Sequence, residues 1–147
     1  MDSLYVLSLL QSIKKIKMSY YFNKILKGKT FDEAIDYVTA ELKKEGFGVL
    51  TEIDVTATLK KKIDVDFKKY TILAACNPKL AHQALQSEDK IGVFLPCNVI
   101  VEEHDNGEVE VSAVDPIASM SSVQNDSLGG IAQEVQEKLK KVIQNME

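Results

Sequence analysis

The residues best suited to chemistry are the two cysteines, because each stands in a similar short phrase beside an amide side chain and a proline. Cys76 and Asn77 precede a proline at the end of an apolar run, and Cys97 and Asn98 follow a proline that interrupts another. A strand has to end or bend at such a proline, because proline lacks the N–H that a sheet ladder needs. We therefore expect both phrases at irregular points of a sheet, where a binding site can form.

Two thiols can bind a soft metal ion, form a redox pair or carry a persulfide. Cu(I) or Zn would need a third donor, for which His82, His104 and Met120 are the candidates. A helix beginning after Cys76 would lower its pKa through the helix dipole. Against these roles, the 20 residues between the cysteines match neither a C-x-x-C nor a zinc-ribbon spacing. Packing as small buried hydrophobes is the alternative for both thiols.

Other polar residues offer fewer possibilities. Asp115 precedes a proline and reads as a strand terminator, but beside Asn77 and Asn98 it would complete a polar rim around an apolar pocket. Glu52 and Asp54 share one face of a strand, where paired carboxylates can divide acid and base roles or simply be solvated. The chain has no P-loop, G-x-G-x-x-G, G-x-S-x-G or H-E-x-x-H motif, so the common nucleotide-binding and hydrolase machineries are absent.

Composition excludes further classes of protein. The chain has 147 residues, 45% of them hydrophobic and 27% charged, which is typical of an ordinary globular domain. A net charge of −4 and the absence of tryptophan leave neither a basic field nor an obvious stacking platform for nucleic acid. We therefore expect no nucleic-acid partner.

Residues 1–17 differ from the rest and are expected to be an N-terminal extension of a single domain that spans residues 18–147. Their apolar stretch is too short to span a membrane, and their lysines follow it rather than precede it as in a secretory signal. Apolar residues at helical spacing allow a short amphipathic helix. Without an export signal, we expect a cytoplasmic protein with reduced cysteines and no transmembrane segment.

The remaining pattern predicts an α+β fold: an antiparallel five-stranded sheet with two long helices on one face and a short inserted helix. A capping box at Thr30 and Glu33 begins the first long helix, which should stop at Gly46. We expect strands at 19–26, 47–59, 70–76, 91–103 and 108–114, a helical turn at 60–62, a loop at 115–120, and helices at 30–46, 78–86 and 128–146.

The hairpin between the last two strands has a predictable register. A three-residue loop at 105–107, with its glycine left-handed, aligns Val101 with Val111 and Val99 with Ala113. A two-residue loop would instead place Val101 opposite a serine. Matching of apolar residues therefore favours the longer loop.

Several phrases occur in an order that resembles a known family. They are Phe31–Ala34, Gly46–Val55, Ala75–Pro78, Leu95–Val99 and Asp115–Pro116. From Met18 to the C-terminus the chain resembles the bacterial and archaeal family called domain of unknown function 302. The resemblance implies a β-α-β4-α fold of the TATA-binding-protein-like class that generally forms homodimers. The family has no settled activity, so no catalytic residue can be carried over.

The hypothesis that follows is a homodimeric module that binds a small molecule without catalysis, between sheet and helices. The residues expected near the rim of its site are Cys76, Asn77, Cys97, Asn98 and Asp115. One alternative is a thiol-based protein that binds a soft metal or carries sulfur through the two cysteines. Another is a structural or partner-binding dimer without a ligand. The sequence identifies no cofactor, metal or catalytic residue.

Overall fold

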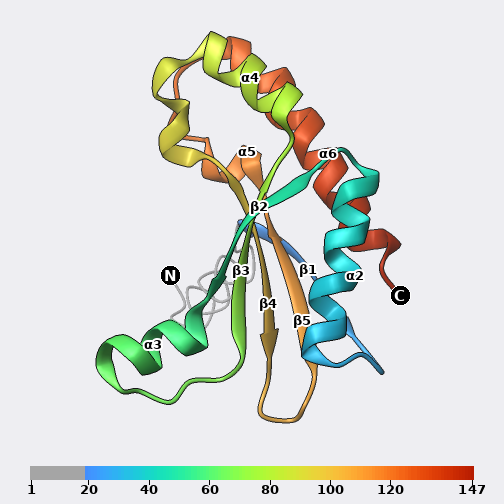
Figure 1. Ribbon diagram of the computed structural model, residues 1–147. Helices are drawn as coiled ribbons and strands as arrows, with labels where there is room; N and C mark the ends of the chain where they lie inside the picture. The colour runs from blue at the N-terminus through green and yellow to red at the C-terminus, as the bar shows by residue number, and fades with distance from the viewer. Residues whose placement is uncertain (1–18) are drawn as a thin grey trace, which may run out of the picture.

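Five antiparallel strands form the centre of the computed structural model, which describes residues 19–147. The strands are β1 (Tyr21–Leu26), β2 (Gly48–Asp54), β3 (Tyr70–Cys76), β4 (Cys97–Glu103) and β5 (Val109–Val114). Their order across the sheet is β1-β5-β4-β3-β2 (Figure 1). The amphipathic helix expected before residue 18, and the boundary expected there, lie outside the described residues.

Two long helices, α2 (Phe31–Lys44) and α6 (Gly129–Asn145), pack on the same face of the sheet (Figure 1). The short helix α4 (Pro78–Ser87) is inserted between β3 and β4. The predicted α+β architecture is therefore confirmed. Within residues 19–147, no helix is both long and apolar enough to cross a membrane.

The start and stop signals of α2 act as predicted. The Thr30 hydroxyl accepts a hydrogen bond from the Glu33 N–H at 3.2 Å, and the Glu33 carboxylate accepts one from the Thr30 N–H at 3.3 Å. The helix is followed by Gly46 in the left-handed conformation, with φ of +84°. Between these ends the helix buries Val38 and Leu42 against the sheet, because apolar residues recur on one stripe.

The second strand is shorter than the alternating pattern predicted. It was expected to continue to residue 59, but β2 ends at Asp54 and the helix α3 (Val55–Ile63) begins at the next residue. The Asp54 carboxylate accepts a hydrogen bond from the Ala57 N–H at 2.9 Å, so it caps a helix instead of lying on a sheet face. A β-bulge between Val49 and Thr51 also interrupts the alternation. The expectation of a 13-residue strand at 47–59 was wrong.

Two further segments differ from the prediction. The strand expected from residue 91 begins only at Cys97, and the 3₁₀ helix η1 (Asp89–Phe94) precedes it. Pro96, joined to Leu95 by a cis bond, separates the two because it has no N–H to donate to a ladder. The loop expected at 115–120 contains the one-turn helix α5 (Pro116–Ser119). A 3₁₀ turn, η2 (Asp126–Leu128), leads into α6.

The hairpin register is confirmed. Val99 pairs with Ala113 and Val101 pairs with Val111, and Gly107 is left-handed with φ of +85°. These four apolar side chains are buried beneath the long helices. The residues that alternate with them lie on the opposite face, which we call the outer face: Asn98, Ile100, Glu102, Glu110 and Ser112.

The apolar interior is divided into two parts. The main core joins the sheet to α2 and α6. A smaller cluster of Ala84, Ile91 and Leu128 holds together the segment that we call the lobe, residues 78–96 and 116–128. The lobe lies beyond one end of the sheet, beside the N-terminal part of α6 (Figure 1). The chain therefore has a large core and a small satellite core, with a junction between them.

Candidate functional site

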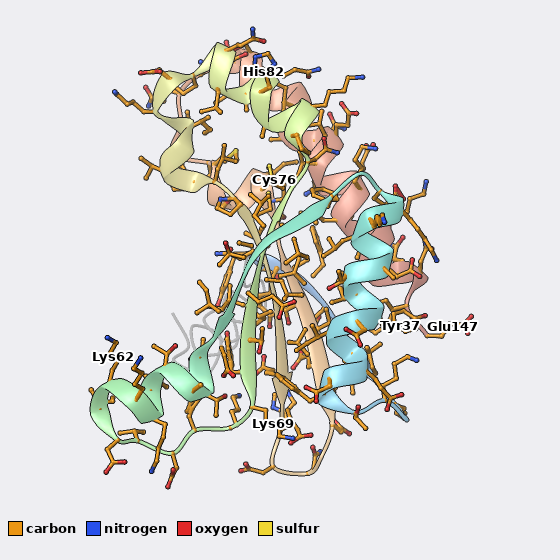
Figure 2. The ribbon with its side chains drawn as sticks, viewed as in Figure 1. Tyr37, Lys62, Lys69, Cys76, His82 and Glu147 are labelled. Carbon is orange, nitrogen blue, oxygen red and sulfur yellow. The ribbon has the colours of Figure 1, made fainter. Side chains whose placement is uncertain are left out.

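A narrow cavity lies at this junction, between the end of the sheet and the lobe. Its wall is almost entirely apolar and is built by the ends of β3 and β4, the lobe and α6, including Cys76, Asn77 and Cys97. Figure 2 shows Cys76 where β3 passes into α4. The cavity has a volume of about 30 Å³, which is room for one or two water molecules.

Sheet register brings the two cysteines to this cavity. Ala75 pairs with Cys97 across β3 and β4, so Cys76 lies next to the partner of Cys97. Both cysteines are free. The loop that separates them in sequence is the one that forms α4 and η1, so the same inserted segment covers the cavity that the thiols line.

The thiols are held in their neutral form. Burial, with a smaller contribution from the neighbouring Cys76, raises the pKa of Cys97 to about 11. Burial also raises the pKa of Cys76. The expectation that the start of α4 would lower the pKa of Cys76 was therefore wrong, because loss of hydration disfavours the charged thiolate. Neither thiol is activated as a nucleophile at neutral pH.

Asn77 is fixed between two helices. Its side-chain oxygen accepts a hydrogen bond from the Leu80 N–H at 3.2 Å, so it caps α4 as predicted. Its amide nitrogen lies so close to Gly46 that a Cβ at this glycine would come within 3.1 Å. Asn77 therefore connects the end of α2 to the beginning of α4, in addition to lining the cavity.

Asn98 and Asp115 do not line this cavity. Asn98 is exposed on the outer face, because successive residues of a strand point to opposite sides. Asp115 caps α5 by accepting from the Ile117 N–H at 3.0 Å, and it also accepts from the Gln136 amide at 3.1 Å. The structure thus places three of the five predicted site residues around one cavity and two elsewhere.

The proposed third metal donors are also scattered. Met120 lines the cavity, but His82 is exposed on α4, away from the end of β3 where Cys76 lies (Figure 2). His104 follows β4 at the end opposite to Cys97. Neither histidine lies beside the thiols. Of the carboxylate pair considered above, Glu52 is exposed and Asp54 caps α3.

A second hollow lies on the outer face and was not predicted. It has a volume of about 420 Å³, and its lining includes Tyr20, Tyr21, Tyr70, Glu102 and Glu110. The signal for part of it was present in the sequence, since the predicted pairing of Val101 with Val111 also places residue 102 opposite residue 110.

The comparisons with known proteins agree with the resemblance described above. The profile of the family described as "Domain of unknown function DUF302" matches residues 22–146. The chain belongs to this family. A solved DUF302 structure, an uncharacterized conserved protein from Bacillus stearothermophilus, superposes with a TM-score of 0.81 and 27% sequence identity. The match covers 88% of this chain and 100% of that chain. No curated protein matches the chain.

Proposed function

We propose that this DUF302 chain is a cytoplasmic, non-catalytic module that binds a small, mainly apolar molecule in the cavity between the sheet and the lobe. The observation that carries the proposal is the place of the cavity at the junction of two separate cores. Its polar wall groups are the Asn77 side chain and two neutral thiols, which supply neither a general base nor an activated nucleophile. Binding without catalysis suits such a wall.

The size of the cavity requires a movement. Pockets that hold drug-sized ligands measure roughly 300–1,000 Å³, whereas the closed cavity has about 30 Å³. A ligand therefore enters only when the lobe moves away from the end of the sheet. The lobe is suited to this movement because Ala84, Ile91 and Leu128 form its own small cluster, so that opening withdraws only Leu80 of α4 from the main core.

The module acts as a homodimer in this proposal, and α3 with the following segment to residue 69 (the arm) supplies the contact. No residue of α3 is buried, and Ile63, Val65 and Phe67 are 63%, 42% and 43% exposed. A nine-residue helix without a fully buried residue is marginal by itself. A second copy offers the same apolar surface, and the arm carries both lysines and aspartates, so it is complementary to itself about a two-fold axis.

Binding of a neutral apolar dye, N-phenyl-1-naphthylamine, tests the ligand site. We expect its fluorescence to rise with the wild-type chain and its affinity to fall at least about tenfold in Ala81→Phe, where the new ring fills the cavity. Ala40→Phe is the matched control, because Ala40 is exposed on α2. Equal dye affinity in both variants, or no dye binding to the wild type, would contradict the proposal.

A further inference from the structure

Two glutamates face each other on the outer face of the sheet. Glu102 of β4 and Glu110 of β5 are direct cross-strand partners near the loop of the hairpin. Their side chains are 14% and 15% exposed. Like charges in this position destabilise a sheet, and partial burial strengthens their repulsion. The pair therefore needs positively charged or hydrogen-bonding partners.

Neighbouring groups partly compensate these charges. Lys68 donates to Glu102 at 2.6 Å. Glu110 accepts from the Asn23 amide at 2.5 Å and lies 2.8 Å from the His104 Nε2. Burial alone would raise the pKa of Glu110, but the hydrogen bonds from Asn23 and His104 outweigh it and lower the pKa. Glu110 is thus an ionised acceptor at neutral pH.

Glu102, His104 and Glu110 converge in the way that metal ligands do. One donor atom each from Glu102, His104 and Glu110 lies within 4.8 Å of the other two. Zinc binds imidazole nitrogen and carboxylate oxygen at about 2.0–2.2 Å, so two donors of a tetrahedral site lie about 3.4 Å apart. The His104 Nε2 and Glu110 Oε1 atoms are 2.8 Å apart, and side-chain rotations of about 1 Å bring the three donors to the tetrahedral spacing, while Glu102 and Glu110 are anchored on paired strands.

We propose that Glu102, His104 and Glu110 form a binding site for a divalent transition-metal ion, with Zn²⁺ as the best match. One imidazole and two carboxylates suit Zn²⁺ better than the oxygen-only sites preferred by Mg²⁺ or Ca²⁺. Three protein ligands leave a coordination position free. The hollow of about 420 Å³ beside the two glutamates gives that position access to water or a small ligand.

The groups around the ligands support this assignment. Binding replaces the contact between His104 and Glu110 by two bonds to the ion, and the ion neutralises two facing carboxylates. Asn23 and Lys68 remain as outer hydrogen-bond partners that orient Glu110 and Glu102. The site is distinct from the cavity beside the cysteines, so its presence does not depend on the function proposed above.

The test is titration of the full chain with Co²⁺, followed by visible absorption, and with Zn²⁺, followed by calorimetry. We expect one ion per chain and an affinity that falls as the pH is lowered, because protons compete for the ligands. His104→Ala and Glu110→Gln should each weaken binding by about tenfold or more. The chain's other histidine provides one control, His82→Ala, and a glutamate with the other orientation on β4 provides a second, Glu103→Gln.

Circular dichroism of each variant separates a lost ligand from a lost fold. A melting temperature raised by Zn²⁺ in the wild type and in both controls, but not in a folded His104→Ala variant, would support the site. Absence of binding to the wild type, or equal losses in His82→Ala and His104→Ala, would overturn it. In that case the cluster is an ion-pair network completed by Lys68.

Discussion

Burial determines what the two cysteines can do. Cys97 is 9% exposed and Cys76 is half-buried, and within residues 19–147 no cation contributes to the pKa shift of either thiol. Activated thiols in proteins lie beside a positive charge or a metal, or at a helix N-terminus. Although α4 begins after Cys76, Asn77 already caps its first turn. The environment of both thiols thus favours packing as small hydrophobic residues.

The pH dependence of Cys97 follows from its raised pKa of about 11. Alkylation by iodoacetamide should be slow at neutral pH and should accelerate as the pH approaches 11, measured by mass spectrometry of peptides. Because the folded pKa exceeds the unfolded value of about 8.5, this group leaves stability unchanged below about pH 8.5 and reduces it between there and 11. The urea midpoint should fall over that window.

The control for the urea measurement is Cys97→Ala. This variant should keep the fold, and its urea midpoint should fall less between about pH 8.5 and 11 than that of the wild type. Rapid alkylation of native Cys97 at neutral pH would contradict the burial argument. It would favour instead the sulfur-carrying or metal-binding alternative for the two thiols.

Part of the candidate site could be predicted from residue types and strand alternation. The role of Asn77 as a helix N-cap could be predicted from the sequence, because Asn77 precedes a proline that suits the first position of a helix. Strand alternation also implies that Cys97 and Asn98 cannot both face one cavity, which the grouping by shared phrases overlooked. Asp115 precedes Pro116 in the same way as Asn77 precedes Pro78, so its capping role was available from the sequence too.

At the scale of elements, local signals predicted the helices that have strong caps and failed where two signals competed. The capping box of α2 and the glycine of the hairpin needed no tertiary information. For residues 47–59, period-two alternation favoured a strand, while Asp54 favoured a helix start. No sequence pattern shows that the strand lacks a partner beyond residue 54, since pairing there depends on where β3 begins.

The lobe should open independently of the main core. Native-state hydrogen exchange measures this directly, because each amide reports the free energy of the opening that exposes it. We expect α4 and η1 to exchange faster than β4 and β5. Leu139→Ala, in the main core, should lower the free energy of unfolding by about 2–5 kcal/mol and accelerate exchange in β4 and β5 while leaving α4 and η1 unchanged.

Ile91→Ala, in the lobe cluster, is the counterpart of that variant. It should accelerate exchange in α4 and η1 and also in the sheet, because global unfolding includes loss of the lobe. If Leu139→Ala accelerates α4 and η1 as much as β4 and β5, the chain unfolds as one unit. The movement that the ligand site requires would then have no support.

At the scale of the whole molecule, several exposed apolar residues gather on α3 and the strand beside it. Figure 1 shows α3 apart from the two long helices. Its exposed apolar residues continue onto the edge strand β2, where Leu50 and Ile53 are 65% and 43% exposed. A nine-residue helix is only about 14 Å long, and a stable dimer buries roughly 800 Å² per partner. The arm alone is too small for the proposed dimer, so we expect the contact to extend from the arm onto β2.

Oligomeric state in solution is therefore the measurement at this scale. Light scattering coupled to size exclusion should give twice the chain mass of 16.4 kDa for the wild type. Ile63→Ser should shift the mass toward the monomer, because it removes apolar area from the centre of the contact. Val93→Ser is the matched control, since Val93 is 81% exposed in η1 of the lobe. A monomeric wild type, or equal dissociation in both variants, would show that a different surface or none mediates assembly. A dimer that persists in Val93→Ser but dissociates in Ile63→Ser would locate the contact on the surface formed by the arm and β2.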